Sequence, residues 1–91
     1  MRIRVEQVES ESSGCPVANQ FIIRSDDGVR FQSYNTVIAF RPCAGPVQLD
    51  RQSWDYSVTT GRYRNQFLGE KKAATERKIK SGEYVLTDLN A

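Results

Sequence analysis

The sequence predicts a small α+β domain, with a single antiparallel sheet of four to six strands and one or two short helices in the C-terminal half. Apolar and polar residues alternate with a period of two through much of the first fifty residues, as in half-buried strands. Residues rich in Gly, Pro, Asp and Ser separate these runs. Beyond residue 57 the large apolar residues recur four apart, as on one face of a helix. Ninety-one residues are enough for one domain, 1–91, and too few for two.

The first strand is predicted near residues 2–8. Ile3 and Val5 alternate with charged residues there, so these two are expected to face inward with the arginines outward. Residues 9–18 have no periodicity and are predicted to form a loop.

A β-hairpin follows. Phe21 and Ile23 are expected to face inward on its first strand, and residues 25–28 (Ser-Asp-Asp-Gly) supply the turn. Val29 and Phe31 then return to inward positions on the second strand.

Two further strands are predicted, over 36–41 and 47–50, and the second is expected to run antiparallel to the first. Tyr34-Asn35 is either a tight turn or a bulge in one long strand, and the sequence allows both. Residues 42–46 contain two prolines, which cannot donate to a ladder, and a glycine that permits a reversal.

The helical half is predicted to begin with a helix over about 58–68. Ser57, or Thr59 if the helix begins late, can cap its first N–H groups, and Tyr63 and Phe67 share one face. Gly69 is placed to end this helix in the left-handed conformation.

A second, weaker helix is predicted over 72–81, with Gly82 as its stop. Residues 84–89 then return as a final strand that can close a sheet edge.

The composition excludes several kinds of chemistry. The chain has no histidine, so it has no Ser-His or Cys-His nucleophile pair and no imidazole acid or base. Two cysteines cannot complete a four-ligand zinc site, and neither Cys15 nor Cys43 has a partner base. The longest apolar run is four residues, far below the roughly 20 that span a bilayer. We expect no enzyme activity, metal, cofactor or membrane span, and reduced thiols in the cytoplasm.

Three segments of the sequence resemble a group of small, mostly uncharacterised proteins of tailed bacteriophages. They are Ser-Tyr-Asn-Thr-Val-Ile-Ala at 33–39, the strand at 47–50, and Trp-Asp-Tyr-Ser-x-Thr-Thr with Arg-Asn-x-Phe-Leu-Gly-Glu within 54–70. The resemblance covers about the last two thirds of the chain. It implies a phage origin and, therefore, action in the host cytoplasm.

Positive charge is concentrated in residues 51–80, which carry eight basic and three acidic side chains, a net charge of +5. A basic surface there is the first candidate partner or nucleic-acid site, with aromatic side chains stacking on unpaired bases. The alternative is that the basic residues are the solvated side of two helices and that Trp54, Tyr63 and Phe67 belong to the core. The candidate residues are Arg62, Arg64, Lys71, Lys72, Arg77, Lys78 and Lys80, with Trp54, Tyr56 or Tyr63 as stacking partners.

The second candidate site is formed by arginines at polar positions of the predicted strands. These arginines either share an exposed sheet face that meets an acidic protein surface or a guide-RNA backbone, or they flank edge strands and discourage aggregation. They are Arg2, Arg4, Arg24, Arg30 and Arg41.

These observations predict a phage-encoded stoichiometric inhibitor of a host defence system. The sharpest hypothesis is an anti-CRISPR protein that binds a Cas effector ribonucleoprotein, at its protein or guide-RNA surface, and blocks target nucleic-acid binding. The alternative is a small phage protein that binds nucleic acid or modulates transcription. The sequence leaves the oligomeric state and the contact face open.

Overall fold

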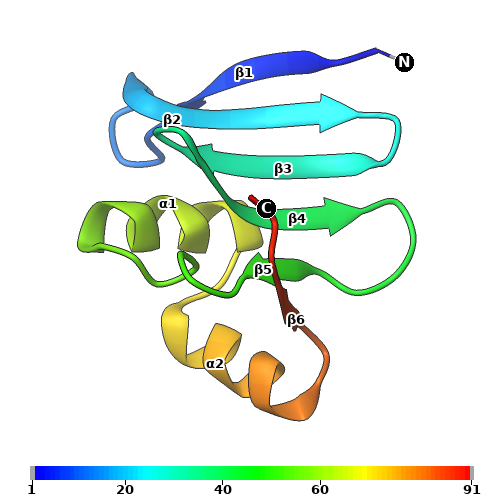
Figure 1. The fold of residues 1–91 in the computed structure, drawn as a ribbon. Helices are drawn as coiled ribbons and strands as arrows, with labels where there is room; N and C mark the ends of the chain where they lie inside the picture. Colours follow the sequence, from blue (N-terminus) through cyan, green and yellow to red (C-terminus); the bar gives the residue numbers. More distant parts are fainter. Residues whose placement is uncertain (1, 91) are drawn as a thin grey trace.

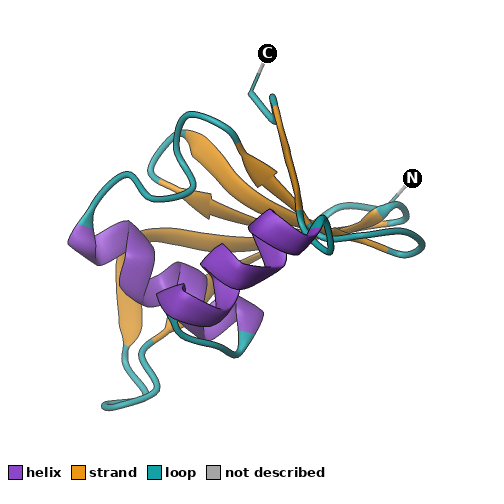
Figure 2. Ribbon diagram, turned by 90° about the horizontal axis from the view of Figure 1, so that it is seen from below, coloured by secondary structure: helices purple, strands orange, loops and turns teal. Residues whose placement is uncertain are grey.

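The chain folds into a six-stranded sheet with two helices packed on one of its faces (Figures 1 and 2). The computed structural model describes residues 2–90. The α+β class is confirmed, and the order of strands across the sheet follows the order in the sequence. The elements are β1 (Arg4–Glu9), β2 (Pro16–Ser25), β3 (Gly28–Ser33), β4 (Thr36–Pro42), β5 (Gln48–Asp50), α1 (Val58–Leu68), α2 (Lys72–Ser81) and β6 (Val85–Thr87).

The sheet is antiparallel from β1 to β5, and β6 then runs parallel to β5. A parallel pair needs a long crossover connection, and here α1 and α2 provide it between the two strands (Figure 1). The expected pairing of 47–50 with 36–41 is confirmed, and the final strand is shorter than expected.

One row of the sheet faces the helices and forms the centre of the core. Ile22, Phe31, Ala39, Leu49 and Leu86 lie opposite one another on successive strands from β2 to β6. Phe31, Ala39 and Leu49 are completely buried, and residues of α1 pack against them. The expected inward position of Phe31 and the core face of α1, through Tyr63 and Phe67, are confirmed, with Phe67 partly buried and its ring 5.9 Å from that of Phe31.

The adjacent row points away from the helices. Val5 lies opposite Ile23, which lies opposite Arg30, and Arg30 in turn lies opposite Phe40. The expectation that Ile3 and Val5 face inward is therefore wrong: Val5 is 60% exposed, and the buried residue of β1 is Val8.

The expectation that Phe21 and Ile23 face inward is wrong for the same reason. β2 carries three consecutive large apolar residues, so alternation alone does not say which set meets the core. Ile22 packs against the core, and Gln20, two residues before it on the same face of β2, is completely buried.

Tyr34-Asn35 is a tight turn, because β3 ends at Ser33 and β4 begins at Thr36, opposite it in the ladder. The register between β3 and β4 shifts beside Phe31, so that Ile38 and Ala39 are both buried although they are adjacent in sequence.

The helix limits agree with those expected. The Oγ of Ser57 accepts a hydrogen bond from the N–H of Thr60 (3.1 Å), and Gly69 ends α1 with φ of 72°. α2 ends at Gly82, whose φ is 84°. Among the described residues no helix is long and apolar enough to cross a membrane.

Candidate nucleic-acid interface

α1 carries two of the candidate arginines, and the helix directs them in opposite directions. Residues two positions apart in an α-helix are rotated by about 200° around the helix axis, so Arg62 and Arg64 cannot share a face. Arg62 is exposed and Arg64 is 1% exposed. The expectation of a single basic surface containing both is therefore wrong.

Arg64 is a structural residue. Its guanidinium donates to the backbone oxygen of Trp54 (2.6 Å) and to the side-chain oxygen of Asn65 (3.0 Å), and it lies 3.4 Å from a carboxylate oxygen of Asp55. The indole of Trp54 lies 5.2 Å from the guanidinium and packs against the core. Of the two alternatives for Trp54, the structure favours the core position.

Lys72 also has an internal partner. Its ammonium lies 2.6 Å from the carboxylate of Asp55, so one carboxylate binds both this lysine and Arg64. The hydrogen bond from Lys72 lowers the pKa of Asp55, with smaller contributions from Arg64. This carboxylate therefore stays ionised at neutral pH and neutralises part of the basic charge in 51–80.

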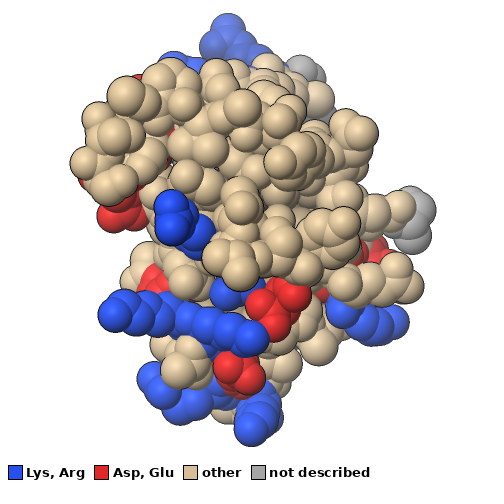
Figure 3. Space-filling view, turned by 90° about the vertical axis from the view of Figure 1, so that its left-hand side faces the viewer, with Lys and Arg blue, Asp and Glu red and all other residues tan. Residues whose placement is uncertain are grey.

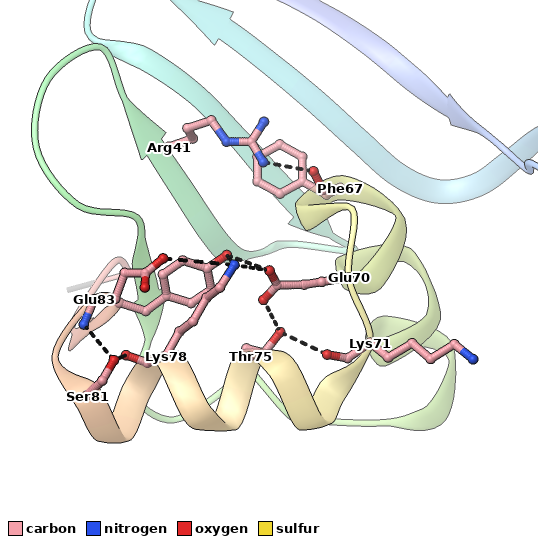
Figure 4. A network of polar contacts seen from close by, with 9 residues as sticks. Arg41, Phe67, Glu70, Lys71, Thr75, Lys78, Ser81 and Glu83 are labelled. Carbon is pink, nitrogen blue, oxygen red and sulfur yellow. Dashed lines mark hydrogen bonds and ion pairs between the residues drawn. The ribbon is translucent and has the colours of Figure 1, made fainter.

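Lys78 belongs to a polar network around Glu70 (Figure 4). The carboxylate of Glu70 accepts hydrogen bonds from Lys78 (2.6 Å), Thr75 (2.8 Å) and the phenol of Tyr84 (3.0 Å). Burial disfavours the charged form of Glu70, but these hydrogen bonds outweigh it and leave the pKa below the ordinary value. The network joins the end of α1, α2 and the chain entering β6, so Lys78 has a structural role.

Four candidate cations remain exposed, and among the described residues none of them forms an ion pair: Arg62, Lys71, Arg77 and Lys80. Arg77 and Lys80 lie three residues apart on α2, and Arg62 and Lys71 line one shallow hollow together with residues 10–12. Figure 3 shows Lys and Arg side chains over the lower part of the face it presents, with Asp and Glu side chains among them, below a broad and largely uncharged upper part.

The arginines of the second candidate site do not share one face. Arg4, Arg24 and Arg41 belong to one row of the sheet, on the helix side, whereas Arg30 lies on the opposite face. The guanidinium of Arg41 lies 5.0 Å from the ring of Phe67 and donates to its backbone oxygen (3.1 Å). Arg2 is exposed outside β1.

Two of these arginines form ion pairs. Arg24 pairs with Glu6, and its hydrogen bond lowers the pKa of that carboxyl. Arg30 pairs with Asp27 (2.9 Å) and covers the ring of Phe40 at 4.0 Å. Both therefore stabilise the sheet locally.

A second hollow, of about 460 Å³, lies where the β3–β4 turn meets the start of α1. Its rim includes two exposed tyrosines, Tyr34 (56% exposed) and Tyr56 (76% exposed). Tyr56 is one of the predicted stacking partners, whereas for Tyr34 the sequence predicts only a place in a turn or a bulge. We call this the hydroxyl hollow, because seven of its eight lining residues carry a hydroxyl and none is charged: Ser33, Tyr34, Thr36, Ile38, Ser53, Tyr56, Ser57 and Thr60.

Both cysteines are free thiols on the surface of the described part of the chain. Within residues 2–90, no three or more Cys, Asp or Glu side chains form a group that could hold a metal ion.

The comparisons with known proteins identify a family and no activity. Residues 3–83 match the model of a family described as "Family of unknown function (DUF8033)", and the chain belongs to that family. No curated protein and no solved structure matches the chain.

Proposed function

We propose that this member of the DUF8033 family is a stoichiometric inhibitor of a host defence system. It binds a CRISPR effector ribonucleoprotein in the host cytoplasm and blocks target nucleic-acid binding. In this proposal the protein makes and breaks no bond; one molecule occupies one effector surface. The resemblance to tailed-phage proteins supports action in the host cytoplasm. The surface of the helical half supports binding through a contact with an effector ribonucleoprotein.

The observation that carries the proposal is the set of four exposed cations within residues 58–81 that form no ion pair in the described part of the chain. Fixed ion pairs neutralise Lys72 and Lys78, whereas Arg62, Lys71, Arg77 and Lys80 are exposed. Exposed ammonium and guanidinium groups gain affinity by displacing the counterions of a phosphate backbone. An effector ribonucleoprotein offers such a backbone in its guide RNA.

The test compares three proteins for capture of a purified effector complex and for protection of target DNA. The first is the wild type, and the second reverses Arg62, Lys71, Arg77 and Lys80 to Glu. The third, a control, reverses Arg2 and Arg4 to Glu, because these arginines of the second candidate site are exposed and form no ion pair within residues 2–90.

We expect the first reversal to abolish capture with little change in melting temperature, because exposed charges contribute little to stability. Capture by the wild type should also weaken steeply with added salt. Loss of capture in the control protein alone would place the site on the arginine-bearing strands. Absence of capture and protection by the wild type would refute the proposal.

The second candidate function is direct binding of nucleic acid, either as a binding module or in modulating transcription. The exposed ring of Tyr56 favours this alternative, because bases stack on exposed aromatic rings. Tight binding to free oligonucleotides, with no capture of the effector, would select it over the inhibitor.

A further inference from the structure

We propose that the hydroxyl hollow binds one unpaired nucleobase of a single-stranded nucleic acid whose backbone lies on Arg62 and Lys71. This inference rests on the phosphate contact in the proposed function and adds a base-binding site to it.

The first step concerns the two tyrosines at the rim. Large exposed aromatic side chains contribute nothing to a core, and each ring presents a face on which a base can stack. Tyr34 and Tyr56 are both more than half exposed and line the same hollow. Neither takes part in an aromatic pair or a cation–π contact within the described chain.

The backbone of Tyr34 is a second, independent observation. Its φ is 56°, in the left-handed region that bulky residues rarely adopt and that Gly, Asn and Asp tolerate. A turn of only two residues between β3 and β4 would be satisfied by glycine or asparagine here. Such a conformation persists where the surrounding structure holds it, here through a hydrogen bond from the N–H of Tyr34 to the backbone oxygen of Asn19 (2.6 Å), and residues held in this way cluster at binding sites.

The chemistry of the lining fits a neutral, planar ligand with donors and acceptors at its edge. Serine and threonine hydroxyls can donate and accept, so they can meet either kind of group on a base. Two of them are fixed by the fold: Ser33 and Thr60 are almost fully buried and 3.1 Å apart, joining β3 to α1. The volume of about 460 Å³ lies within the range of small-ligand sites.

The hollow is continuous with the basic surface. Ser57 lines the hydroxyl hollow and also a neighbouring hollow at the start of α1, which Arg62 lines as well. Arg62 in turn lines the hollow that contains Lys71. These two hollows are also lined by the carboxylates of Glu11, Asp55 and Glu70, of which the last two are held in ion pairs. A strand that places a base against the tyrosines therefore meets Arg62 and Lys71 as unpaired cations along the path of its phosphates, and this combination of stacking and positive charge is typical of sites for unpaired nucleic acid.

The test measures the affinity of fluorescein-labelled octamers of uridine, of deoxyuridine, and of abasic sugar-phosphate by fluorescence anisotropy. The variants are Tyr56→Ala, Tyr34→Asn and the conservative Tyr34→Phe. Gln52→Ala, at an exposed position outside the hollow, is the matched control.

We expect Tyr56→Ala and Tyr34→Asn each to lose about 10-fold in affinity for the base-containing octamers and nothing for the abasic one. Tyr34→Phe should bind as the wild type does. Tyr34→Asn should melt at the same or a higher temperature, because asparagine relieves the positive φ, and a merely structural tyrosine would not show this separation. Equal binding of the RNA and DNA octamers would assign the contact to the base, and preference for RNA would add a contact to the 2′-hydroxyl.

Unchanged affinity in both tyrosine variants would overturn the inference and leave the phosphate contact standing. Capture of the effector by a protein that binds no octamer would also overturn it, while the proposed function survived. If neither the effector nor any octamer bound the wild type, the proposed function itself would fail, and the base site with it.

Discussion

Replacing Arg64 should destabilise the domain far more than replacing Arg62, although both are arginines on α1. Arg64→Ala leaves the backbone oxygen of Trp54 without its 2.6 Å donor and removes a fully buried side chain from beside the indole. Removing one of the two partners of a buried ion pair lowers the free energy of unfolding by about 3–5 kcal/mol. We expect the lower end, about 3 kcal/mol, because Asp55 keeps its contact with Lys72 and is not left as an unpaired charge.

For a domain of this size a loss of about 3 kcal/mol lowers the melting temperature by more than about 10 °C. Arg62→Ala is the matched control, two residues away and exposed, and should leave the melting temperature nearly unchanged. Thermal and urea denaturation followed by far-UV circular dichroism measure both. Equal melting temperatures for the two variants would refute the structural role of Arg64. Effector capture by Arg64→Ala, measured well below its melting temperature, should stay intact.

Three further predictions concern Glu70, the thiols and Gly28. The folded-state pKa of Glu70 lies below the ordinary 4.5, so its contribution to stability is present above that pH and is lost as the pH falls through the folded-state value. Urea unfolding between pH 7 and 3 should therefore show a shallower pH dependence for Glu70→Gln than for the wild type, and identical slopes would contradict the network. Replacing Cys15 and Cys43 with Ser should leave binding and melting temperature unchanged, and both thiols should react with a thiol reagent in the folded protein. Gly28→Ala should destabilise strongly, because a Cβ there would overlap the backbone oxygen of Arg41. Gly45→Ala, also at positive φ but in open space, is the control, and equal losses of stability in the two variants would show that the overlap at Gly28 is unimportant.

Local signals were sufficient for most of the fold. Asp-Asp-Gly at 26–28 predicts the first hairpin, and Ser57 and Gly69 predict the two ends of α1, because each depends only on neighbouring residues. Which face of a strand meets the core does not depend on neighbouring residues alone. β2 is apolar at three consecutive positions, and only its register with β3 and the position of α1 select Ile22 rather than Phe21 or Ile23. The parallel pairing of β6 likewise depends on how two helices return the chain, which no local pattern encodes.

The buried arginine could have been found from the sequence. Thr60, Arg64 and Leu68 are spaced four apart, and they lie beside Tyr63 and Phe67 on the stripe that the apolar residues define. An arginine on the buried stripe of a helix has to find internal acceptors, and the tryptophan and aspartate that supply them stand in the same short segment of sequence. The same proximity of basic and aromatic residues also predicts a contact surface, and for Arg64 that prediction is wrong.

The charge of residues 51–80 has a different meaning once its partners are known. Asp55 binds Arg64 and Lys72, and Glu70 binds Lys78, so part of the basic excess holds the helices against the sheet. The positive charge that remains available to a partner is smaller and more localised. Arg62 and Lys71 line one hollow, and Arg77 and Lys80 lie in the C-terminal half of α2. A contact made by few cations gives modest affinity on its own, because the electrostatic part of the binding free energy grows with the number of phosphates that the cations neutralise. Specific binding at this surface therefore requires a second, uncharged contribution, and the exposed tyrosines of the hydroxyl hollow are placed to provide it.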